Sequence, residues 1–84
     1  MHYVYVIRSS KDHNFYTGYT VDLKQRIIEH NRQKNFATKS RGPFKLIYYE
    51  SCINRKDAKR REIYLKTAWG KRYIKNRLRS YLTG

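Results

Sequence analysis

The chain has 84 residues and a formal net charge of +14, because 20 lysines and arginines stand against six aspartates and glutamates. A domain of this length buries only about 60% of the surface that its unfolded chain exposes, so we expect a single domain over residues 1–84 with one small core. The one cysteine, Cys52, excludes an internal disulfide, and with three scattered histidines it does not make a structural zinc site. No apolar run approaches the ~20 residues that cross a bilayer, so we expect a cytoplasmic protein without membrane contact.

The first half of the chain predicts two strands and a helix. The segment His2–Arg8 is rich in β-branched and aromatic residues and is apolar on both faces, which predicts a central strand that is covered on each side. A polar turn over Ser9–Asn14 leads to Phe15–Thr20, which we expect to be its antiparallel partner. Asp22 is a suitable N-cap for a helix that runs to about Arg32.

A basic polar loop is predicted next, over Gln33–Arg41. The pair Gly42-Pro43 follows it and introduces a third strand, Phe44–Glu50, because proline suits the start or the edge of a strand. Beyond that strand, Asn54 is a plausible N-cap for a second helix that continues through residue 66.

The last segment predicts one more helix. Gly70 is expected to interrupt the chain, and Lys71–Leu82 then carries apolar residues at helical spacing. The resulting order is β-β-α-β-α-α, which predicts an α/β domain with a small antiparallel sheet. We find no internal repeat, low-complexity tract or linker in the sequence.

Basic residues are concentrated near the C-terminal end of the chain. From Ile53 to Gly84 there are eleven lysines and arginines and only two acids. So large a charge repels itself, and it therefore points to a polyanionic partner, with nucleic acid as the first candidate. Nine tyrosines are interleaved with these charges and suit contacts with sugars, phosphates or unstacked bases. The alternative is a basic protein whose charges are only solvated and whose tyrosines only form the core.

Three polar residues fall on or beside the apolar faces of the predicted helices. His30 lies on the inward stripe of the first helix, and Arg26 lies at the border of that stripe. In the second helix Glu62 shares the face of Ala58. A half-buried carboxylate is costly unless a cation or a metal neutralises it, so Glu62 is either the partner of an arginine, which spacing alone favours, or a ligand. His30 is either a hydrogen-bonded core histidine or part of a site, and Arg26 can simply reach the surface.

A single inward carboxylate argues against a two-metal nuclease centre, which needs several converging carboxylates. It permits one hard cation held by Glu62, water and a substrate phosphate. Nucleophilic catalysis has weaker support, because no serine is convincingly placed beside His30 and Cys52 has the character of a small packing residue.

The order of these residues resembles a known family. Tyr3-Val4-Tyr5, Tyr16-Thr17-Gly18, the segment Asp22–Arg26, His30-Asn31 and the later Glu62 together resemble the GIY-YIG nuclease domain from Tyr3 to about Leu82. The chain is similar to small standalone bacterial members that are related to the N-terminal nuclease domain of the excision-repair endonuclease. The resemblance implies a three-stranded antiparallel sheet flanked by helices.

The match has three departures from the family pattern. Tyr3 stands where the first motif has its glycine, and Thr17 replaces the central isoleucine of the second motif. Neither position supplies chemistry. Tyr19 stands where some relatives carry a lysine, which leaves open what contacts phosphate or activates a base there.

The resemblance also implies an activity and a site. It implies a divalent-metal-dependent endonuclease that hydrolyses phosphodiester bonds in DNA, structure-specific and related to repair, with one Mg²⁺ or Mn²⁺ held by Glu62. The expected catalytic residues are Tyr5, Tyr16, Arg26, His30 and Glu62. The expected nucleic-acid contacts are Gly18, Tyr19, Arg61, Lys66, Lys71, Arg72 and Asn76.

Several features of that function stay open at this point. The substrate is expected to be branched or duplex DNA, with RNA as a further option and with a protein partner as one way to select targets. The sequence does not decide which tyrosine takes a proton from the attacking water. The competing functional class is a non-catalytic basic module of the same fold that binds nucleic acid without cutting it.

Overall fold

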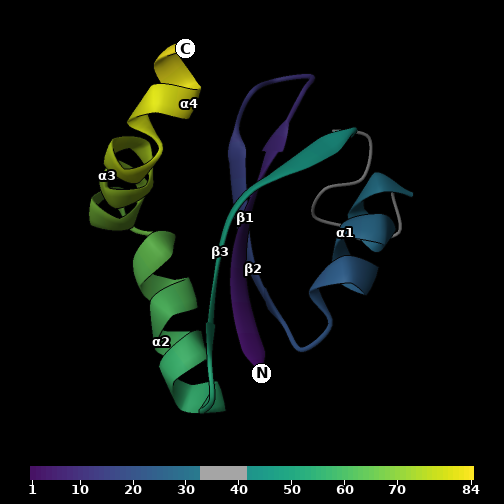
Figure 1. The fold of residues 1–84 in the computed structure, drawn as a ribbon, viewed down its shortest axis with the longest axis vertical. Coiled ribbons are helices and arrows are strands. Elements are labelled where there is room, and N and C mark those ends of the chain that lie inside the picture. Colours follow the sequence, from purple (N-terminus) through teal and green to yellow (C-terminus); the bar gives the residue numbers. More distant parts are fainter. Residues whose placement is uncertain (33–41) are drawn as a thin grey trace.

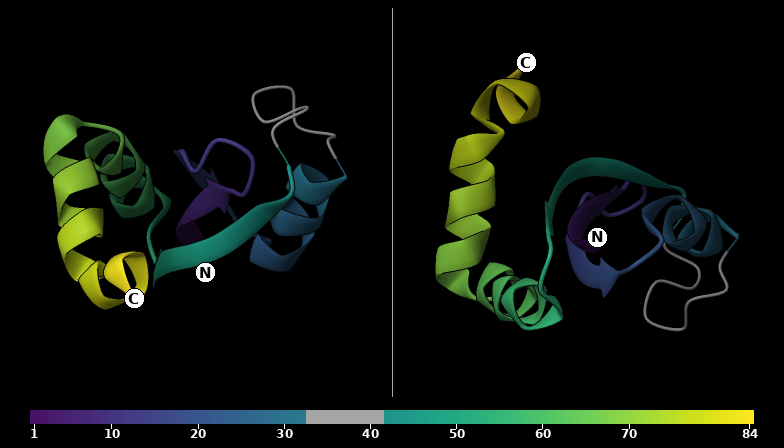
Figure 2. Two further views of the ribbon diagram at one scale, coloured as in Figure 1. Left: turned by 90° about the horizontal axis from the view of Figure 1, so that it is seen from above. Right: turned by 60° about the horizontal axis from the view of Figure 1, so that its bottom comes forward.

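The computed structural model describes residues 1–32 and 42–84, and the loop that the sequence predicts over 33–41 lies outside the described residues. A β-sheet lies between α1 on one face and α2 and α3 on the other, as Figures 1 and 2 show. The elements in chain order are β1 (His2–Ser9), β2 (Phe15–Thr20), α1 (Leu23–Asn31), β3 (Phe44–Cys52), α2 (Arg55–Leu65), α3 (Ala68–Arg77) and α4 (Arg79–Thr83). None of the described helices is long and apolar enough to cross a bilayer.

The sheet has the strand order β2-β1-β3, and both pairings are antiparallel. The central place of β1 confirms the prediction from its two apolar faces, because Val4 to Ile7 are all at most 2% exposed. In the register, Tyr5 lies opposite Gly18 of β2 and opposite Tyr49 of β3. The third strand runs two residues beyond the predicted Glu50, because residues 51 and 52 still pair with β1.

The core is divided between the two faces of the sheet. Val4 and Val6 point to one face and pack with Ala58, Leu65 and Ile74 of α2 and α3. On the other face Tyr5, Ile7 and Phe44 form a second cluster, against which Leu23 and Ile27 of α1 pack. Full burial of a valine, leucine or isoleucine side chain stabilises the folded state by roughly 1.5–3 kcal/mol. The alternation along β1 therefore fixes a helix on each side of the sheet.

The helices begin where capping residues satisfy their first N–H groups. Asp22 accepts a hydrogen bond from the Gln25 amide, and Asn54 accepts one from the Lys56 amide, as the sequence indicates. Thr67 caps α3 in the same way through the Gly70 amide.

The prediction that Gly70 interrupts the chain was wrong. Gly70 is the third residue of α3, and a side chain there would overlap the Tyr64 carbonyl and the Leu65 backbone. The glycine is needed because α2 and α3 meet closely at this point, where any other residue would force them apart. The predicted final helix also divides at Leu78 into α3 and α4.

Candidate active site

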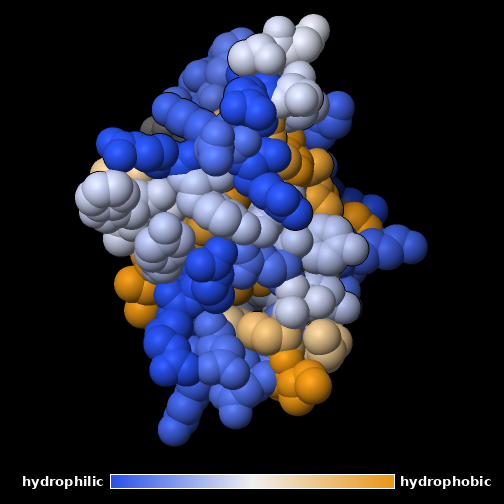
Figure 3. Space-filling view, turned by 60° about the vertical axis from the view of Figure 1, so that its left-hand side comes forward, coloured by the Kyte–Doolittle hydropathy of each residue, from blue (hydrophilic) through white to orange (hydrophobic). Residues whose placement is uncertain are grey.

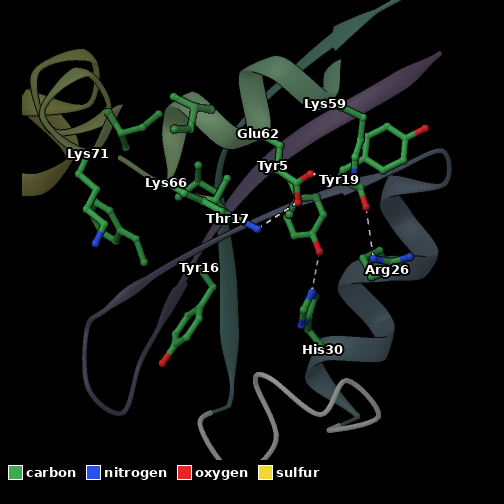
Figure 4. A pocket seen from close by; sticks show the side chains of 15 residues that line it. Tyr5, Tyr16, Thr17, Tyr19, Arg26, His30, Lys59, Glu62, Lys66 and Lys71 are labelled. Atoms are coloured by element: carbon green, nitrogen blue, oxygen red, sulfur yellow. Dashed lines mark hydrogen bonds and ion pairs between the residues drawn. The ribbon is translucent and has the colours of Figure 1, made fainter. Parts of the chain in front are cut away.

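A pocket of about 570 Å³ opens between the sheet and the helices on both of its faces. All five residues that the sequence predicts to be catalytic line this pocket, and so do the predicted contacts Gly18, Tyr19, Lys66 and Lys71. Figure 4 shows that the side chains come from opposite directions. Glu62 enters from α2 and His30 from α1, with the ring of Tyr5 between them. Arg26 stands at one end of the pocket, and Tyr16 and Lys71 stand at the other.

A hydrogen bond joins Tyr5 to His30 at the floor of the pocket. The Tyr5 hydroxyl lies 2.8 Å from His30 Nε2, and the two residues are 2% and 3% exposed. Burial raises the pKa of Tyr5 despite the opposing hydrogen bond and charge of Arg26. Burial lowers the pKa of His30, and the Arg26 charge lowers it further. At neutral pH, Tyr5 is therefore protonated and His30 neutral, and the tautomer of the imidazole decides which of the two groups donates in this hydrogen bond.

Gly18 leaves the space that the Tyr5 side chain fills. The two residues are direct partners across β1 and β2. A side-chain carbon at Gly18 would overlap the hydroxyl and ring carbons of Tyr5. The absence of a side chain at Gly18 therefore sets the position of the Tyr5 hydroxyl.

Glu62 is ionised and neutralised by lysines. Its side chain is 13% exposed, Oε1 lies 3.0 Å from Lys59 Nζ, and Oε2 lies 3.2 Å from Lys66 Nζ. Burial alone would raise the pKa of Glu62, but the hydrogen bonds from the two lysines outweigh it and keep that pKa below 4.5. The arginine partner that spacing favours is thus replaced by two lysines. The sequence analysis missed Lys59, although its place three residues before Glu62 could have indicated it.

Arg26 carries its charge at the rim of the pocket. Its Nη1 donates to the Tyr19 carbonyl oxygen at 3.3 Å, and its Nε lies 3.3 Å from a Glu29 oxygen. Its side chain is 35% exposed, so the guanidinium remains accessible from the pocket. The hydrogen bond and charge of Arg26 lower the pKa of Tyr5, and the charge of Arg26 lowers the pKa of His30.

The other two tyrosines of the pocket stand in different surroundings. Tyr16 packs edge-on against Phe44, and its hydroxyl donates to Asp12 Oδ2 at 3.4 Å. The Tyr19 hydroxyl is 2.7 Å from His2 Nδ1, and Lys59 Nζ lies 4.8 Å from the centre of the Tyr19 ring.

Three predicted nucleic-acid contacts do not line this pocket. Arg61 makes two 2.7 Å hydrogen bonds to Glu50 of β3. The Arg72 guanidinium lies 4.9 Å from the centre of the Trp69 ring, and Asn76 is exposed on α3. Successive residues of a helix point about 100° apart, so Arg61 and Arg72 face away although Glu62 and Lys71 beside them face inward.

The pocket suits one hard cation better than a cluster of metals. Among the described residues, no group of three or more histidine, cysteine, aspartate or glutamate side chains could hold a metal ion. Of the described residues that line the pocket, Glu62 alone carries a carboxylate. One ionised carboxylate in an accessible pocket fits Mg²⁺ or Mn²⁺, which take their other ligands from water and substrate phosphates.

Comparisons with known proteins identify relatives over most of the chain. The model of the GIY-YIG catalytic domain matches residues 1–77. A UPF0213 protein of Clostridium perfringens is 43% identical over 67 residues, which cover 79% of this chain and 71% of the relative. A UPF0213 protein of Halobacterium salinarum is also 43% identical over 67 residues, or 79% of this chain and 86% of the relative.

The fold has a counterpart among solved structures. The solution NMR structure of a UPF0213 protein from Bacillus halodurans has a TM-score of 0.55 and 34% sequence identity. The likeness covers 87% of this chain and 80% of that chain. It supports a three-stranded antiparallel sheet with helices as the fold of this chain.

Proposed function

This chain belongs to the GIY-YIG family, and from that premise we propose that it is a divalent-metal-dependent endonuclease that hydrolyses phosphodiester bonds in DNA. One observation carries the proposal. An ionised Glu62, the Arg26 guanidinium and the Tyr5–His30 hydrogen bond meet in a single pocket beside further lysines. Metal-dependent hydrolysis of a phosphodiester uses these three kinds of group: a metal ligand, a phosphate-binding cation and a proton acceptor.

Glu62 is the residue that would hold Mg²⁺ or Mn²⁺. When bound, the metal supplies Lewis-acid stabilisation of the charge that grows on the phosphate and on the leaving oxygen. The low pKa of Glu62 keeps the carboxylate available for the metal at neutral pH. Lys59 and Lys66 neutralise that carboxylate in the metal-free protein.

Arg26 would bind the same phosphate from the far end of the pocket. A guanidinium offers several N–H donors in a fixed plane and matches phosphate oxygens in pairs. Arg26 is tethered through the Tyr19 carbonyl, which fixes where its charge stands. A cation positioned in this way stabilises the transition state without reorganising during the reaction.

Tyr5 is our candidate for the proton acceptor. Its hydroxyl lies 2.8 Å from His30 Nε2, so in the proposed step Tyr5 passes its own proton to His30 as its oxygen takes a proton from the attacking water. Because the two transfers are concerted, the step needs no free phenolate, which the raised pKa of Tyr5 and the lowered pKa of His30 disfavour. The Tyr16 hydroxyl instead donates to a carboxylate oxygen of Asp12.

The proposed activity is tested with end-labelled single-stranded, duplex, flap and four-way-junction DNA in Mg²⁺, Mn²⁺ or EDTA. We expect metal-dependent cutting that falls at least about 100-fold in Glu62→Gln. Asp57→Asn is the matched control, because it removes the same charge from an exposed position on α2. Binding without scission on every substrate would overturn the proposal in favour of a non-catalytic nucleic-acid-binding module. The same panel tests a preference for branched DNA, and with it a role in repair.

The tyrosines form a second pair for comparison. Tyr5→Phe should reduce cutting about 100-fold or more, and Tyr16→Phe should reduce it far less. The reverse order would assign the proton transfer to Tyr16. Circular dichroism of both variants shows whether either loss reflects unfolding.

A further inference from the structure

A second pocket adjoins the candidate active site and shares Tyr16 and Lys71 with it. Figure 4 shows where these two residues stand in the first pocket. It has a volume of about 440 Å³ and is lined by His13, Asn14, Phe15, Tyr16, Lys71 and Lys75. Phe15, Tyr16 and Lys71 also line the first pocket, so a ligand can extend from one pocket into the other without leaving the surface.

The second pocket has uncompensated positive charge. Lys71 and Lys75 are one turn apart on α3, and both line the second pocket opposite Phe15 and Tyr16 of β2. Neither lysine makes an ion pair within the part of the chain that the structure describes, whereas Lys59 and Lys66 are engaged by Glu62. The exposed lysines of the second pocket therefore offer a polyanion two charges with no internal partner to displace.

The loop between β1 and β2 presents His13 at the edge of the second pocket. His13 has a φ of 63°, in the left-handed region that is costly for a residue with a side chain. Its amide donates to the Ser9 carbonyl oxygen at 2.9 Å, and the amides of Lys11 and Asp12 donate to the hydroxyl of the fully buried Ser9. These hydrogen bonds hold the loop and therefore fix where the imidazole can stand.

The nearest acid in this loop is already engaged. One oxygen of Asp12 accepts the Asn14 amide at 2.9 Å, and the other accepts the Tyr16 hydroxyl at 3.4 Å. Asp12 does not line the second pocket, so no carboxylate of the described residues faces an anion there.

We propose that the second pocket binds an unpaired nucleotide adjacent to the phosphate in the first pocket. Lys71 and Lys75 contact the backbone phosphates, and the rings of Tyr16 and His13 contact the base. Aromatic rings beside cations form the usual site for a single strand, whose bases are accessible, whereas the bases of a duplex are stacked inside it. The proposal rests on the proposed function for the ligand of the first pocket, and it specifies a substrate with a single-stranded segment.

The test is fluorescence anisotropy in EDTA, which needs no cleavage. The probes are a labelled 12-residue oligothymidylate and a labelled 12-base-pair duplex. We expect Lys75→Ala to weaken binding of the single strand about 3- to 10-fold and binding of the duplex less than about 2-fold. Lys56→Ala is the control, because it removes the same charge from an exposed position of α2 that lines neither pocket. It should change neither affinity by more than about 2-fold.

Two results would overturn the proposal. If Lys75→Ala and Lys56→Ala lose the same affinity, the effect comes from overall charge and not from the second pocket. If Lys75→Ala loses the same affinity for both probes, the second pocket has no preference for an unpaired strand. NMR provides a second readout, because the amide resonances of His13 and Asn14 should shift with the oligothymidylate in the wild-type protein. If the binding tests succeed and the protein never cuts DNA, only the proposed function is contradicted. If the protein cuts DNA and Lys75→Ala does not change binding, only the proposal for the second pocket is contradicted.

Discussion

Gly18 controls the position of the Tyr5 hydroxyl because it has no side chain and leaves room for the phenol. The two residues face each other across β1 and β2, and a methyl group at Gly18 would occupy the volume of the phenol. We therefore expect Gly18→Ala to displace the hydroxyl from His30 and to lower the cleavage rate about 100-fold, the usual cost of misplacing a reacting group by about 1 Å. Single-turnover cleavage measures this change directly.

Gly42→Ala is the matched control for that substitution. Within residues 1–32 and 42–84, a side-chain carbon at Gly42 would meet Phe44 alone, at 3.8 Å, which is ordinary van der Waals contact. We expect this variant to keep wild-type activity. Wild-type activity in Gly18→Ala would show that the exact place of the Tyr5 hydroxyl does not matter for cleavage.

The placement of single residues could be predicted where helical periodicity decides it. That His30 and Glu62 lie on the inner faces of their helices follows from spacing, and both are found there. The partners could not be predicted in the same way. The sequence analysis gave Glu50 only as the end of a predicted strand, yet the Glu50 carboxylate binds Arg61 of α2. Such pairs depend on how β3 and α2 pack against each other. The spacing of residues along a single element carries no information about that packing.

At the scale of elements, an ion pair fastens α2 to the sheet. Arg61 of α2 binds both oxygens of Glu50 in β3, and the Tyr48 hydroxyl also donates to Glu50, at 3.0 Å. The hydrogen bond from Arg61 lowers the pKa of Glu50 against the effect of burial, and Tyr48 adds to this. Because Glu62 follows Arg61 directly, this ion pair also fixes which face of α2 enters the active pocket.

The lowered pKa of Glu50 makes the stability of the protein depend on pH. The folded protein has the lower pKa, so the contribution of Glu50 is complete above the unfolded value of 4.5 and is lost as the pH falls through the folded pKa. We expect Glu50→Gln to lower the free energy of unfolding by about 1 kcal/mol at pH 7, a modest cost because the Arg61 side chain is 37% exposed.

Urea unfolding at pH 7 and at pH 3.5 measures both effects. The difference in stability between Glu50→Gln and the wild type should shrink at the lower pH. The pKa of Glu62 is also lowered in the folded protein, and Glu62 is still present in the Glu50→Gln variant. The stability of the variant should therefore still fall to some extent at acid pH. An unchanged difference at the two pH values would contradict the assigned role of Glu50.

The arrangement of elements could be predicted better than their ends. The two apolar faces of β1 predicted the central strand, and the capping residues Asp22 and Asn54 marked two helix starts. Gly70 misled the prediction because the same residue suits a chain break and a close contact between helices. Only the packing of α2 on α3 distinguishes these roles.

At the scale of the whole molecule, the net charge of +14 is not uniformly available to a ligand. The side that carries α2 and α3 is largely hydrophilic in Figure 3. Within it, Arg60 and Arg61 are paired with acids, and Lys59 and Lys66 are held by Glu62 inside the pocket. In the metal-free protein the Glu62 carboxylate therefore opposes the binding of phosphate, because it engages the two lysines that would otherwise contact the phosphate.

This opposition predicts that one substitution changes binding and cleavage in opposite directions. In EDTA, Glu62→Gln should bind a single-stranded oligonucleotide more tightly than the wild type, because it removes the negative charge and releases Lys59 and Lys66 to contact phosphates. Each lysine released should steepen the slope of log Kobs against log salt concentration by about 0.7. The variant should nevertheless cut DNA more slowly, because it lacks the metal ligand.

Asp57→Asn separates this local effect from net charge. It removes the same charge and releases Arg60, but at an exposed position outside the pocket. A salt titration of all three proteins by fluorescence anisotropy should show a steeper slope for Glu62→Gln than for Asp57→Asn. If the slope and the affinity increase equally in both variants, the net charge alone governs binding. In that case Lys59 and Lys66 do not contact phosphates when Glu62 releases them.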